Sequence, residues 1–433
     1  MDNAKIRATA IFATALLAAG GAVFGAPAKT NVECAKDNGG ITLPEGFCAV
    51  VVADDVGSAR HLAVNKNGDI YVALSQVNGD SRKGGIAALR DTNGDGRADV
   101  TEYFGDETGT GIAVRGDWLY FAPDDKVLRY RLKPGQLVPE RKPETIVKNL
   151  PEQDEHSAKS MAFDARGNMY VNIGAPSNSC QRSDRAPHSP GIKPCSLLER
   201  HGGIWRFKAD KENQTQGDGK RYATGTRNVI ALAWNTPADQ LEGVQMGRDQ
   251  LHDLWPEHFT TKQSAELPAE EFLEIGEGDN FGWPYCYYDQ LQGKRVLAPE
   301  YGGDGKKTDN CEKYPRPIMA FPGHWAPIAL LFYTGKQFPE RYREGAFIAF
   351  HGSWNRAPEP QAGYKVVFVP FAHGKPAGPY ETFADGFAGT QKPMSSGDAQ
   401  YRPVGLAQGP DGSLYISDSQ RGRIWRVIYV GKQ

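Results

Sequence analysis

Hydrophobic and polar positions alternate in a unit that recurs along most of the chain. Each copy begins with an apolar pair, passes through a turn that usually contains glycine, and continues as an alternating strand with an aromatic residue. The six copies are residues 61–74, 111–123, 160–174, 231–247, 329–352 and 405–418. Most copies are followed by a further short strand-like stretch, at 84–90, 125–132, 202–208, 363–371 and 422–430. Alternation with a period of two and glycine turns predicts antiparallel hairpins.

The six units together predict an all-β fold, a six-bladed β-propeller with blade insertions. Segment 43–53 is expected to supply an early strand that closes the ring against the last blade. A β-sandwich or a stacked solenoid is the alternative. The propeller is favoured because it tolerates repeats of unequal length, whose insertions leave the blades as loops on one face.

Aligning the units brings residues that are distant in sequence to one mouth of the central channel. The aligned positions are Ala63, Ala113, Ala162, Ala233, Leu331 and Ala407. Six residues before them stand Gly57, Glu107, His156, Arg227, Trp325 and Tyr401, with Asn228, His324 and Arg402 beside them. Since each innermost strand of a propeller begins at the same mouth, the sequence predicts a polar binding site there. Solvated loop positions are the alternative.

Histidine and arginine give this predicted mouth its chemistry. An arginine fork binds a carboxylate or phosphate through two hydrogen bonds, so Arg227 and Arg402 favour a ligand with several such groups. A neutral His156 in a partly closed site can accept a proton near neutral pH. Glu155, the preceding residue, either tunes the imidazole or faces solvent.

The N-terminus has the pattern of a secretory signal. Lys5 and Arg7 precede an apolar, alanine-rich stretch that ends in small residues at Ala28. We expect residues 1–28 to be cleaved as a signal peptide and residues 29–433 to form one propeller domain, periplasmic or secreted. An uncleaved anchor is the alternative, although the stretch is shorter than the ~20 apolar residues of a spanning helix. No membrane span is expected after cleavage.

Six cysteines fit an exported protein, in which disulfides are the default over metal ligation. Six cysteines permit 15 pairings, and the closure entropy of short loops favours the sequential one. The expected pairs are Cys34–Cys48, Cys180–Cys195 and Cys286–Cys311. The formal net charge of -2 over 433 residues gives no indication of nucleic acid or an anionic membrane as a partner.

Four motifs resemble one protein family. They are GTRNVIALAW (225–234), GDNFGWPYC (278–286), HGSWNRAPEPQAGYKVV (351–367) and YRPVGLAQGPDGSLYISD (401–418). In this order they resemble the glucose/sorbosone dehydrogenases, most closely the sorbosone dehydrogenase-like branch, over roughly residues 42–430. Members of this family are soluble periplasmic propeller enzymes that use pyrroloquinoline quinone (PQQ) and calcium.

The resemblance implies a role for each matching residue. His156 matches the base that takes the substrate hydroxyl proton while hydride passes to the quinone. Arg227, Asn228 and Arg402 match residues that contact PQQ. The calcium-binding stretch matches QMGRDQ, which implies the carbonyl groups of Gly247 and Arg248, with Asp249 close by. Calcium prefers such oxygen ligands.

The chain also departs from the glucose-oxidising members of this family. Gln400 stands where they have an arginine, and Asn355 and Arg356 stand near the position of a lysine. Arg356 and Arg60 are expected to supply the missing positive charge. The Gly-Pro of the calcium loop is Gly-Arg here. These departures predict weaker or rearranged PQQ binding.

A second calcium site is a separate hypothesis. Residues 91–102 match the EF-hand loop template at Asp91, Asn93, Asp95, Gly96, Asp99 and Glu102. The flanking stretches look like strands, whereas the template expects helices. A polar hairpin between two strands is therefore favoured over a structural calcium site.

The sequence leaves three functions open. The favoured one is a PQQ- and calcium-dependent dehydrogenase that oxidises a sugar or aldehyde and passes electrons to an unidentified acceptor, a cytochrome or a quinone. Here His324 and Trp325 are candidates for contact with the substrate. A calcium-dependent lactonase would need carboxylates and asparagine around a metal, for which Glu107, Asn228 and Asp249 are available. A non-catalytic propeller that binds a glycan or a protein is the third.

Overall fold

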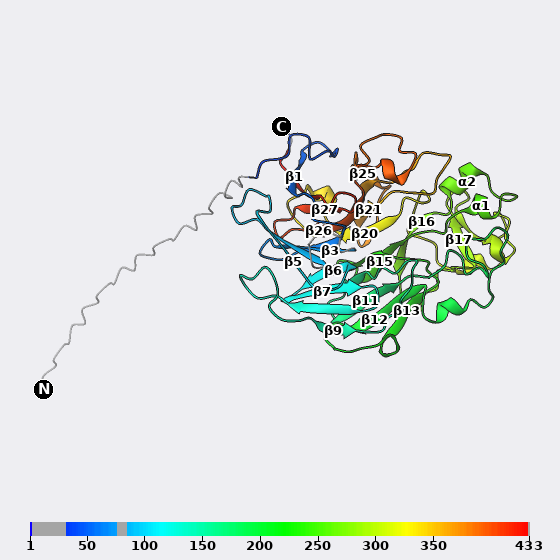
Figure 1. The fold of residues 1–433 in the computed structure, drawn as a ribbon, viewed down its shortest axis with the longest axis horizontal. Helices are drawn as coiled ribbons and strands as arrows, with labels where there is room; N and C mark the ends of the chain where they lie inside the picture. The colour runs from blue at the N-terminus through cyan, green and yellow to red at the C-terminus, as the bar shows by residue number, and fades with distance from the viewer. Residues whose placement is uncertain (2–31, 76–84, 432–433) are drawn as a thin grey trace.

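The computed structural model describes residues 1, 32–75 and 85–431, so nearly all of the expected signal peptide lies outside the described residues. The described chain forms six four-stranded antiparallel sheets and two small hairpins. The first strand of each sheet contacts the first strands of both neighbouring sheets, which closes the ring. The fold is therefore the predicted six-bladed β-propeller (Figure 1).

Each blade has one strand at each of four positions, counted outward from the central axis. The innermost strands are β2 (Ala59–Val64), β6 (Gly109–Arg115), β10 (Met161–Phe163), β14 (Ala231–Asn235), β20 (Pro327–Phe332) and β26 (Pro403–Gln408). The second strands are β3 (Ile70–Leu74), β7 (Trp118–Pro123), β11 (Asn168–Ile173), β15 (Gln240–Gln245), β21 (Ala346–Phe350) and β27 (Leu414–Asp418). The third strands are β4 (Ile86–Arg90), β8 (Val127–Arg131), β12 (Gly203–Lys208), β16 (Glu270–Ile275), β22 (Lys365–Val369) and β28 (Ile424–Tyr429). The outermost strands are β5 (Val100–Phe104), β9 (Glu144–Val147), β13 (Lys220–Thr224), β19 (Met319–Phe321), β25 (Glu381–Ala384) and β1 (Phe47–Ala53). We number the blades 1 to 6 in this order.

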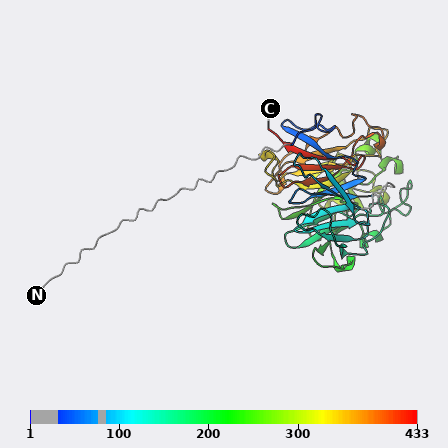
Figure 2. The same cartoon turned by 60° about the vertical axis from the view of Figure 1, so that its left-hand side comes forward.

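The ring is closed by strand β1, which comes early in the chain but belongs to the last blade. It pairs antiparallel with β28, and Phe47 lies opposite Tyr429. Both views show this early strand, in blue, against the orange and red strands of the C-terminal part (Figures 1 and 2). The predicted closing role of segment 43–53 is confirmed.

The repeat alignment agrees with the observed strand register. The aligned residues of the innermost strands face equivalent residues of the second strands, as Ala63 faces Tyr71, Ala113 faces Tyr120, Ala162 faces Tyr170, Ala233 faces Glu242, Leu331 faces Phe347 and Ala407 faces Tyr415. Tyr71, Tyr120 and Tyr170 are buried, and each hydroxyl donates to a carbonyl or carboxylate oxygen. The aromatic residue of the repeat therefore fills the core between neighbouring blades without leaving a buried hydroxyl unpaired.

The insertions are concentrated in blades 3 to 5. They carry the short helices α1 (Leu251–Leu254) and α2 (Thr261–Glu266) and the hairpins β17 (Cys286–Asp289) with β18 (Lys294–Leu297) and β23 (Phe371–Ala372) with β24 (Lys375–Pro376). Figure 1 shows α1, α2 and β17 together at one side of the molecule. Within the described residues, no helix is long and apolar enough to cross a bilayer.

The three disulfides are those that the sequence predicts. They join Cys34 to Cys48, Cys180 to Cys195 and Cys286 to Cys311. The first braces the segment that leads into β1. The other two close insertions of blades 3 and 4.

Candidate active site

One cavity opens at the mouth of the channel, where the innermost strands of blades 3, 4 and 5 begin. Three connections surround it: 174–202 between β11 and β12, 246–269 between β15 and β16, and 351–364 between β21 and β22. Its volume is about 330 Å³. It is lined by Glu155, His156, Arg185, Arg227, Met246, Gly247, Asp249, Glu270, His324, Ala326, Trp354 and Asn355. Six of these residues are ones that the sequence predicts for the site: His156, Arg227, Gly247, Asp249, His324 and Asn355.

The imidazole of His156 is held in one orientation by the protein backbone. Its Nδ1 atom lies 2.5 Å from the carbonyl oxygen of Ala175. A carbonyl oxygen only accepts hydrogen bonds, so Nδ1 carries the proton and Nε2 of the neutral ring is an acceptor. Gly174 permits this approach, since a Cβ atom there would lie 2.6 Å from the Cβ atom of His156. Burial, reinforced by the charge of Arg227, lowers the pKa of His156 to about 4.

The carboxylate of Asp249 accepts hydrogen bonds from several donor groups that line the cavity. Its Oδ2 atom accepts hydrogen bonds from Nη2 of Arg227 at 2.7 Å and Nη2 of Arg185 at 3.0 Å. Its Oδ1 atom accepts from Nδ2 of Asn355 at 2.8 Å and lies 3.6 Å from Nδ1 of His324. Burial alone would raise the pKa of Asp249, but Arg227, His324 and Arg185 hold it well below the usual range. The carboxylate is therefore ionised throughout the neutral range.

Arg185 and Asn178 belong to this site although the repeat pattern gave no indication of them. Arg185 also donates from Nε to Glu155 at 2.9 Å. The buried side chain of Asn178 donates to the Asp249 carbonyl oxygen at 3.0 Å and accepts from its amide at 2.8 Å. Both residues lie in the connection 174–202, which joins the second and third strands of blade 3 and is not part of the repeated unit. The pair Cys180–Cys195, which flanks Arg185, is the only sequence signal that this connection is structured.

Three further cations lie where the innermost strands of blades 1, 3 and 6 begin. These channel cations are Arg60, Lys159 and Arg402. Their hydrogen bonds go to neutral oxygens: Arg60 donates to a threonine hydroxyl, and Lys159 and Arg402 donate to backbone carbonyls. Among the described residues, none of the three forms an ion pair with a carboxylate. Burial lowers the pKa of Lys159 to about 8 and that of Arg60 to about 10.

Two predicted cofactor contacts have their side chains engaged elsewhere. Arg356 was expected to supply charge to the mouth, but its buried guanidinium donates to Glu266 at 2.6 Å and to Gly323 at 3.2 Å. The side chain thus anchors its loop to neighbouring elements and does not line the cavity. Asn228 is also buried, and its Oδ1 atom accepts from Nδ2 of Asn172 at 2.9 Å.

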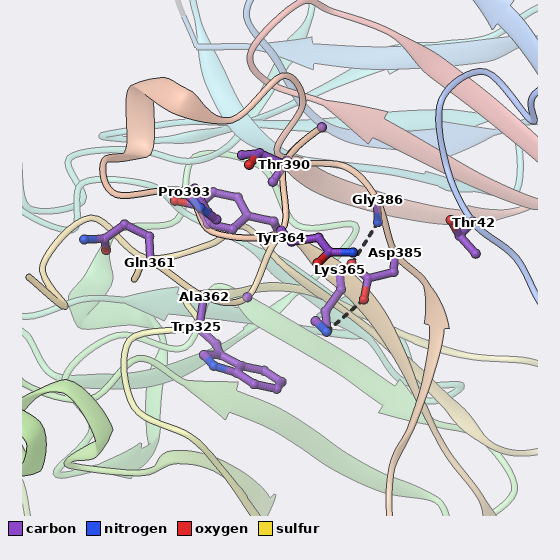
Figure 3. A pocket seen from close by; sticks show the side chains of 14 residues that line it. Thr42, Trp325, Gln361, Ala362, Tyr364, Lys365, Asp385, Gly386, Thr390 and Pro393 are labelled. Atoms are coloured by element: carbon purple, nitrogen blue, oxygen red, sulfur yellow. Dashed lines mark hydrogen bonds and ion pairs between the residues drawn. The ribbon is translucent and has the colours of Figure 1, made fainter. Parts of the chain in front are cut away.

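Three members of the predicted ring also turn away from the cavity. Glu107 forms an ion pair with Lys126 at 2.9 Å. Tyr401 is buried, with its ring 5.1 Å from that of Trp425. Trp325 lines a second cavity of about 650 Å³, beside the ion pair of Lys365 and Asp385 (Figure 3). Equivalent positions in the repeat therefore share their place ahead of an innermost strand but not their side-chain direction.

A family comparison agrees with this architecture. A model of a family described as TrAA12-like matches residues 41–430. The chain belongs to the TrAA12-like family. A pyrroloquinoline quinone-dependent pyranose dehydrogenase of Coprinopsis cinerea is 30% identical over 187 residues, which are 37% of this chain and 25% of that protein. The chain spans less than two thirds of the length of the curated relatives that it matches.

Solved structures share the fold of this TrAA12-like chain. The calcium structure of a Trichoderma reesei enzyme of family AA12 has a TM-score of 0.72 at 18% identity, over 93% of this chain and 99% of that one. The holo form of the PQQ domain of Coprinopsis cinerea pyranose dehydrogenase has a TM-score of 0.70 at 19% identity, over 90% and 97%. At these identities the comparison shows the fold alone.

The donor set of this TrAA12-like chain fits a polycarboxylate such as PQQ. The three channel cations have no carboxylate partners among the described residues, and Nε of Arg227 is buried without a hydrogen-bond partner. Oδ1 of Asn355 is also buried and unpaired. Cations at a channel mouth that make no direct ion pair favour an anionic ligand.

Two of the predicted oxygen sources for the cofactor calcium, the Gly247 carbonyl and the Asp249 carboxylate, do not fit that ion as they are arranged. The Gly247 carbonyl accepts from Nη1 of Arg227 at 2.8 Å. Both carboxylate oxygens of Asp249 accept from the donors described above, while the Arg248 side chain is buried in an ion pair with Glu300 at 2.5 Å. A dication at these oxygens would lie beside two guanidinium groups. No group of three or more His, Cys, Asp or Glu side chains in the described chain has a metal-binding arrangement.

Residues 91–99 form the turn between β4 and β5, and residues 100–102 begin β5, as the hairpin hypothesis predicts. Asp91 accepts from the amides of Gly94 and Gly96 at 2.7 and 2.8 Å. Asp99 accepts from the amide and the hydroxyl of Thr92. The acidic side chains thus stabilise the turn itself, and strands rather than helices flank it. The remaining template residues, Asn93, Asp95 and Glu102, lie on the same exposed turn or on β5.

Proposed function

We propose that this TrAA12-like chain is a PQQ-dependent oxidoreductase that oxidises an aldose or a related aldehyde. The observation that carries the proposal is the state of His156. Its ring is neutral, its tautomer is set by Ala175, and it lines the same cavity as Arg185 and Arg227. A proton acceptor beside binding groups for an anionic cofactor is the arrangement that such an oxidation requires.

In this proposal His156 accepts the substrate proton, and the cations at the channel mouth bind the cofactor. The substrate hydroxyl donates its hydrogen bond to Nε2 of His156, which takes the proton as the carbon is oxidised. The imidazolium then formed is stabilised by the Ala175 carbonyl through Nδ1–H. When bound, PQQ supplies the two-electron oxidant. Arg227, Arg402, Arg60 and Lys159 would hold this anionic cofactor.

Asp249 has a positioning role in this proposal. It fixes the guanidinium groups of Arg227 and Arg185 and the amide of Asn355 by direct hydrogen bonds. Orienting these groups before the ligand arrives reduces the conformational entropy lost on binding. We assign no calcium to the Gly247–Asp249 segment. The calcium structure of the Trichoderma enzyme is the reason to test calcium as a second component.

An exported location is part of the same proposal. Three disulfides favour an oxidising compartment, the periplasm or the cell exterior. An external acceptor, a cytochrome or a quinone, would then reoxidise the cofactor.

The lactonase alternative has lost its support. Its three candidate metal ligands do not converge: Glu107 pairs with Lys126, Asn228 with Asn172, and Asp249 with two arginines. No specific observation favours it over an oxidation.

An absorbance titration of the purified chain with PQQ, with calcium and with a chelator, tests the proposal. We expect saturable binding at micromolar PQQ, followed by dye-linked oxidation of members of an aldose and aldehyde panel. Absence of PQQ binding at micromolar concentration in both conditions would overturn it.

A further inference from the structure

The indole of Trp354 is exposed at the mouth of the candidate active site. Its relative exposure is 55%, although most large apolar side chains of the described chain are buried. It lines the same cavity as His156 and Arg185. Among the described residues it takes part in no aromatic pair or cation–π contact. An indole in this position presents apolar surface to whatever enters the cavity.

The backbone that carries this indole is fixed on both sides. The preceding residue, Ser353, is fully buried; its hydroxyl donates to Gln361 at 2.8 Å and its amide to the carbonyl of Ala362 at 2.8 Å. The next residue, Asn355, is bonded to Asp249. The exposed tryptophan is therefore not a product of a loose loop.

The base of this loop is closed as tightly as its tip. Gly363 has a φ of 95°, and a Cβ atom there would lie 2.8 Å from the carbonyl oxygen of Trp325 and 2.9 Å from Cα of Gly352. The amide of Gly352 donates to the same carbonyl at 3.0 Å. Arg356 adds the anchors to Glu266 and Gly323. Because the backbone around Trp354 is already fixed, little backbone entropy is lost when a ligand packs on the indole.

We propose that Trp354 is the stacking platform for the pyranose ring of the substrate. A pyranose has a face of C–H groups that packs on an aromatic ring, and hydroxyl groups at its edge that need hydrogen-bond partners. The cavity offers an aromatic surface and hydrogen-bond partners together, because the Trp354 indole lines it with the polar groups of Glu155, His156 and Arg185. Stacking would place one edge of the sugar toward His156 and so select cyclic sugars over short acyclic aldehydes.

This inference rests on the proposed sugar oxidation, so the two are tested separately. Trp354→Ala, Trp354→Phe and the control Met394→Ala are compared with the unmodified chain, each reconstituted with PQQ. Met394 is also exposed, at 53%, and its carbonyl accepts from Gln361 of the neighbouring loop, but it does not line the cavity. PQQ affinity, measured by absorbance, is expected to be the same in all four proteins.

For an aldopyranose substrate, Trp354→Ala is expected to raise KM about tenfold, since aromatic stacking contributes in that range, with kcat reduced less. Trp354→Phe should recover most of this loss. Oxidation of glycolaldehyde, which has no ring, should change little, and Met394→Ala should behave like the unmodified chain. An unchanged KM for pyranoses in Trp354→Ala would overturn the inference while leaving the oxidation in place. A second result would also overturn the inference: an equal loss of activity in Trp354→Ala and Met394→Ala that is seen only with a protein electron acceptor. Such a loss would indicate that both side chains belong to a surface on which the acceptor docks.

A binding measurement that needs no turnover covers the case in which no sugar is oxidised. Saturation-transfer NMR with methyl β-D-glucopyranoside, which keeps the ring but has no free anomeric hydroxyl, reports contact directly. We expect transfer to the ring C–H protons that Trp354→Ala removes and Met394→Ala retains. Transfer that persists in Trp354→Ala, or no transfer to the unmodified chain, would overturn the inference independently of the oxidation.

Discussion

Arg227 and Asp249 form a buried ion pair at the channel mouth, with Nη2 and Oδ2 2.7 Å apart. The side chains are only 4% and 10% exposed. Arg185 approaches the same carboxylate from a different connection. One negative charge therefore keeps two guanidinium groups close together, and the stability of the mouth depends on it.

Asp249→Asn should lower the free energy of unfolding by about 3 kcal/mol, because it leaves the buried Arg227 without its counter-charge and removes one of the carboxylate partners of Arg185. Asp385→Asn is the matched control. It breaks a more exposed ion pair with Lys365 at 3.0 Å and should cost less than about 1 kcal/mol. Denaturant unfolding of both variants measures the difference, and similar losses would contradict the buried character of the Asp249 contacts.

The low pKa of His156 predicts the acid limb of the reaction. Burial and then Arg227 lower this pKa to about 4, so the ring stays neutral, and able to accept a proton, down to that pH. The kcat/KM profile should fall near pH 4 rather than near 6.5. His156→Gln should lose 100-fold or more in kcat, on the order expected for a general base, whereas the exposed His188→Gln should keep the full profile. A limb at pH 6.5 would show that His156 is more solvated than its contacts indicate.

Variants of Arg402 and Arg356 distinguish an arginine that binds the cofactor from one that anchors a loop at the channel mouth. Arg402→Gln should weaken PQQ binding about tenfold and make it less sensitive to salt, since a channel cation without a carboxylate partner is lost. Arg356→Gln should leave PQQ affinity unchanged but lower the melting temperature, because it removes buried anchors of the 351–364 connection. The reverse assignment in the absorbance titration would restore Arg356 as a cofactor contact.

Calcium binding can be examined without PQQ. The oxygens of Gly247 and Asp249 accept from arginine, and those of Asp91 accept from backbone amides. We therefore expect calorimetry of the unloaded chain to show no calcium binding at micromolar concentrations. Should heat appear, the double variant Asp91→Ala, Asp95→Ala assigns it: loss of the signal places the ion in the β4–β5 turn, and its persistence points to the mouth.

The buried carboxyl group of Glu242 should make the folded protein less stable as pH rises. This carboxyl is 1% exposed on β15, and burial raises its pKa to about 8. It is neutral when folded but ionises above about pH 4.5 when unfolded, so its contribution to stability is lost as pH rises from 4.5 to 8. Glu242→Gln should therefore gain in melting temperature over the unmodified chain as pH rises through this range. A difference that stays constant with pH would show that the group titrates alike in both states.

Strand pairing within a blade was predictable because it follows from local alternation, as in Ala162 opposite Tyr170 of one hairpin. Ring closure joins residues from the two ends of the chain, such as Phe47 and Tyr429. It could be expected because a ring of six repeated units needs an early strand to complete the last blade. The same alignment placed His156 and Arg227 at one mouth. Both residues stand six positions ahead of the aligned alanine of an innermost strand, and both line the cavity.

The remainder of the site depends on contacts that no local pattern records. Arg185 reaches Asp249 from an insertion that lies outside the repeated unit. Arg356 is drawn into the protein by Glu266 and Gly323, which belong to another blade and another turn. Trp325 turns toward a second cavity although it occupies the same repeat position as His156. Side-chain direction here is decided by tertiary partners, which periodicity does not contain.

The seam between blades 6 and 1 has a consequence for how the cofactor and the fold depend on one another. Arg402 precedes β26 on one side of this seam, and Arg60 lies in β2 on the other, where its carbonyl oxygen accepts from the Ser417 hydroxyl at 2.6 Å. A polycarboxylate bound by both arginines would hold the last blade and the first blade together across their seam. Any ligand that binds only the closed ring raises the work needed to open it. Binding of PQQ should therefore slow the separation of blades 6 and 1, so that occupancy of the site also determines how fast the folded ring opens.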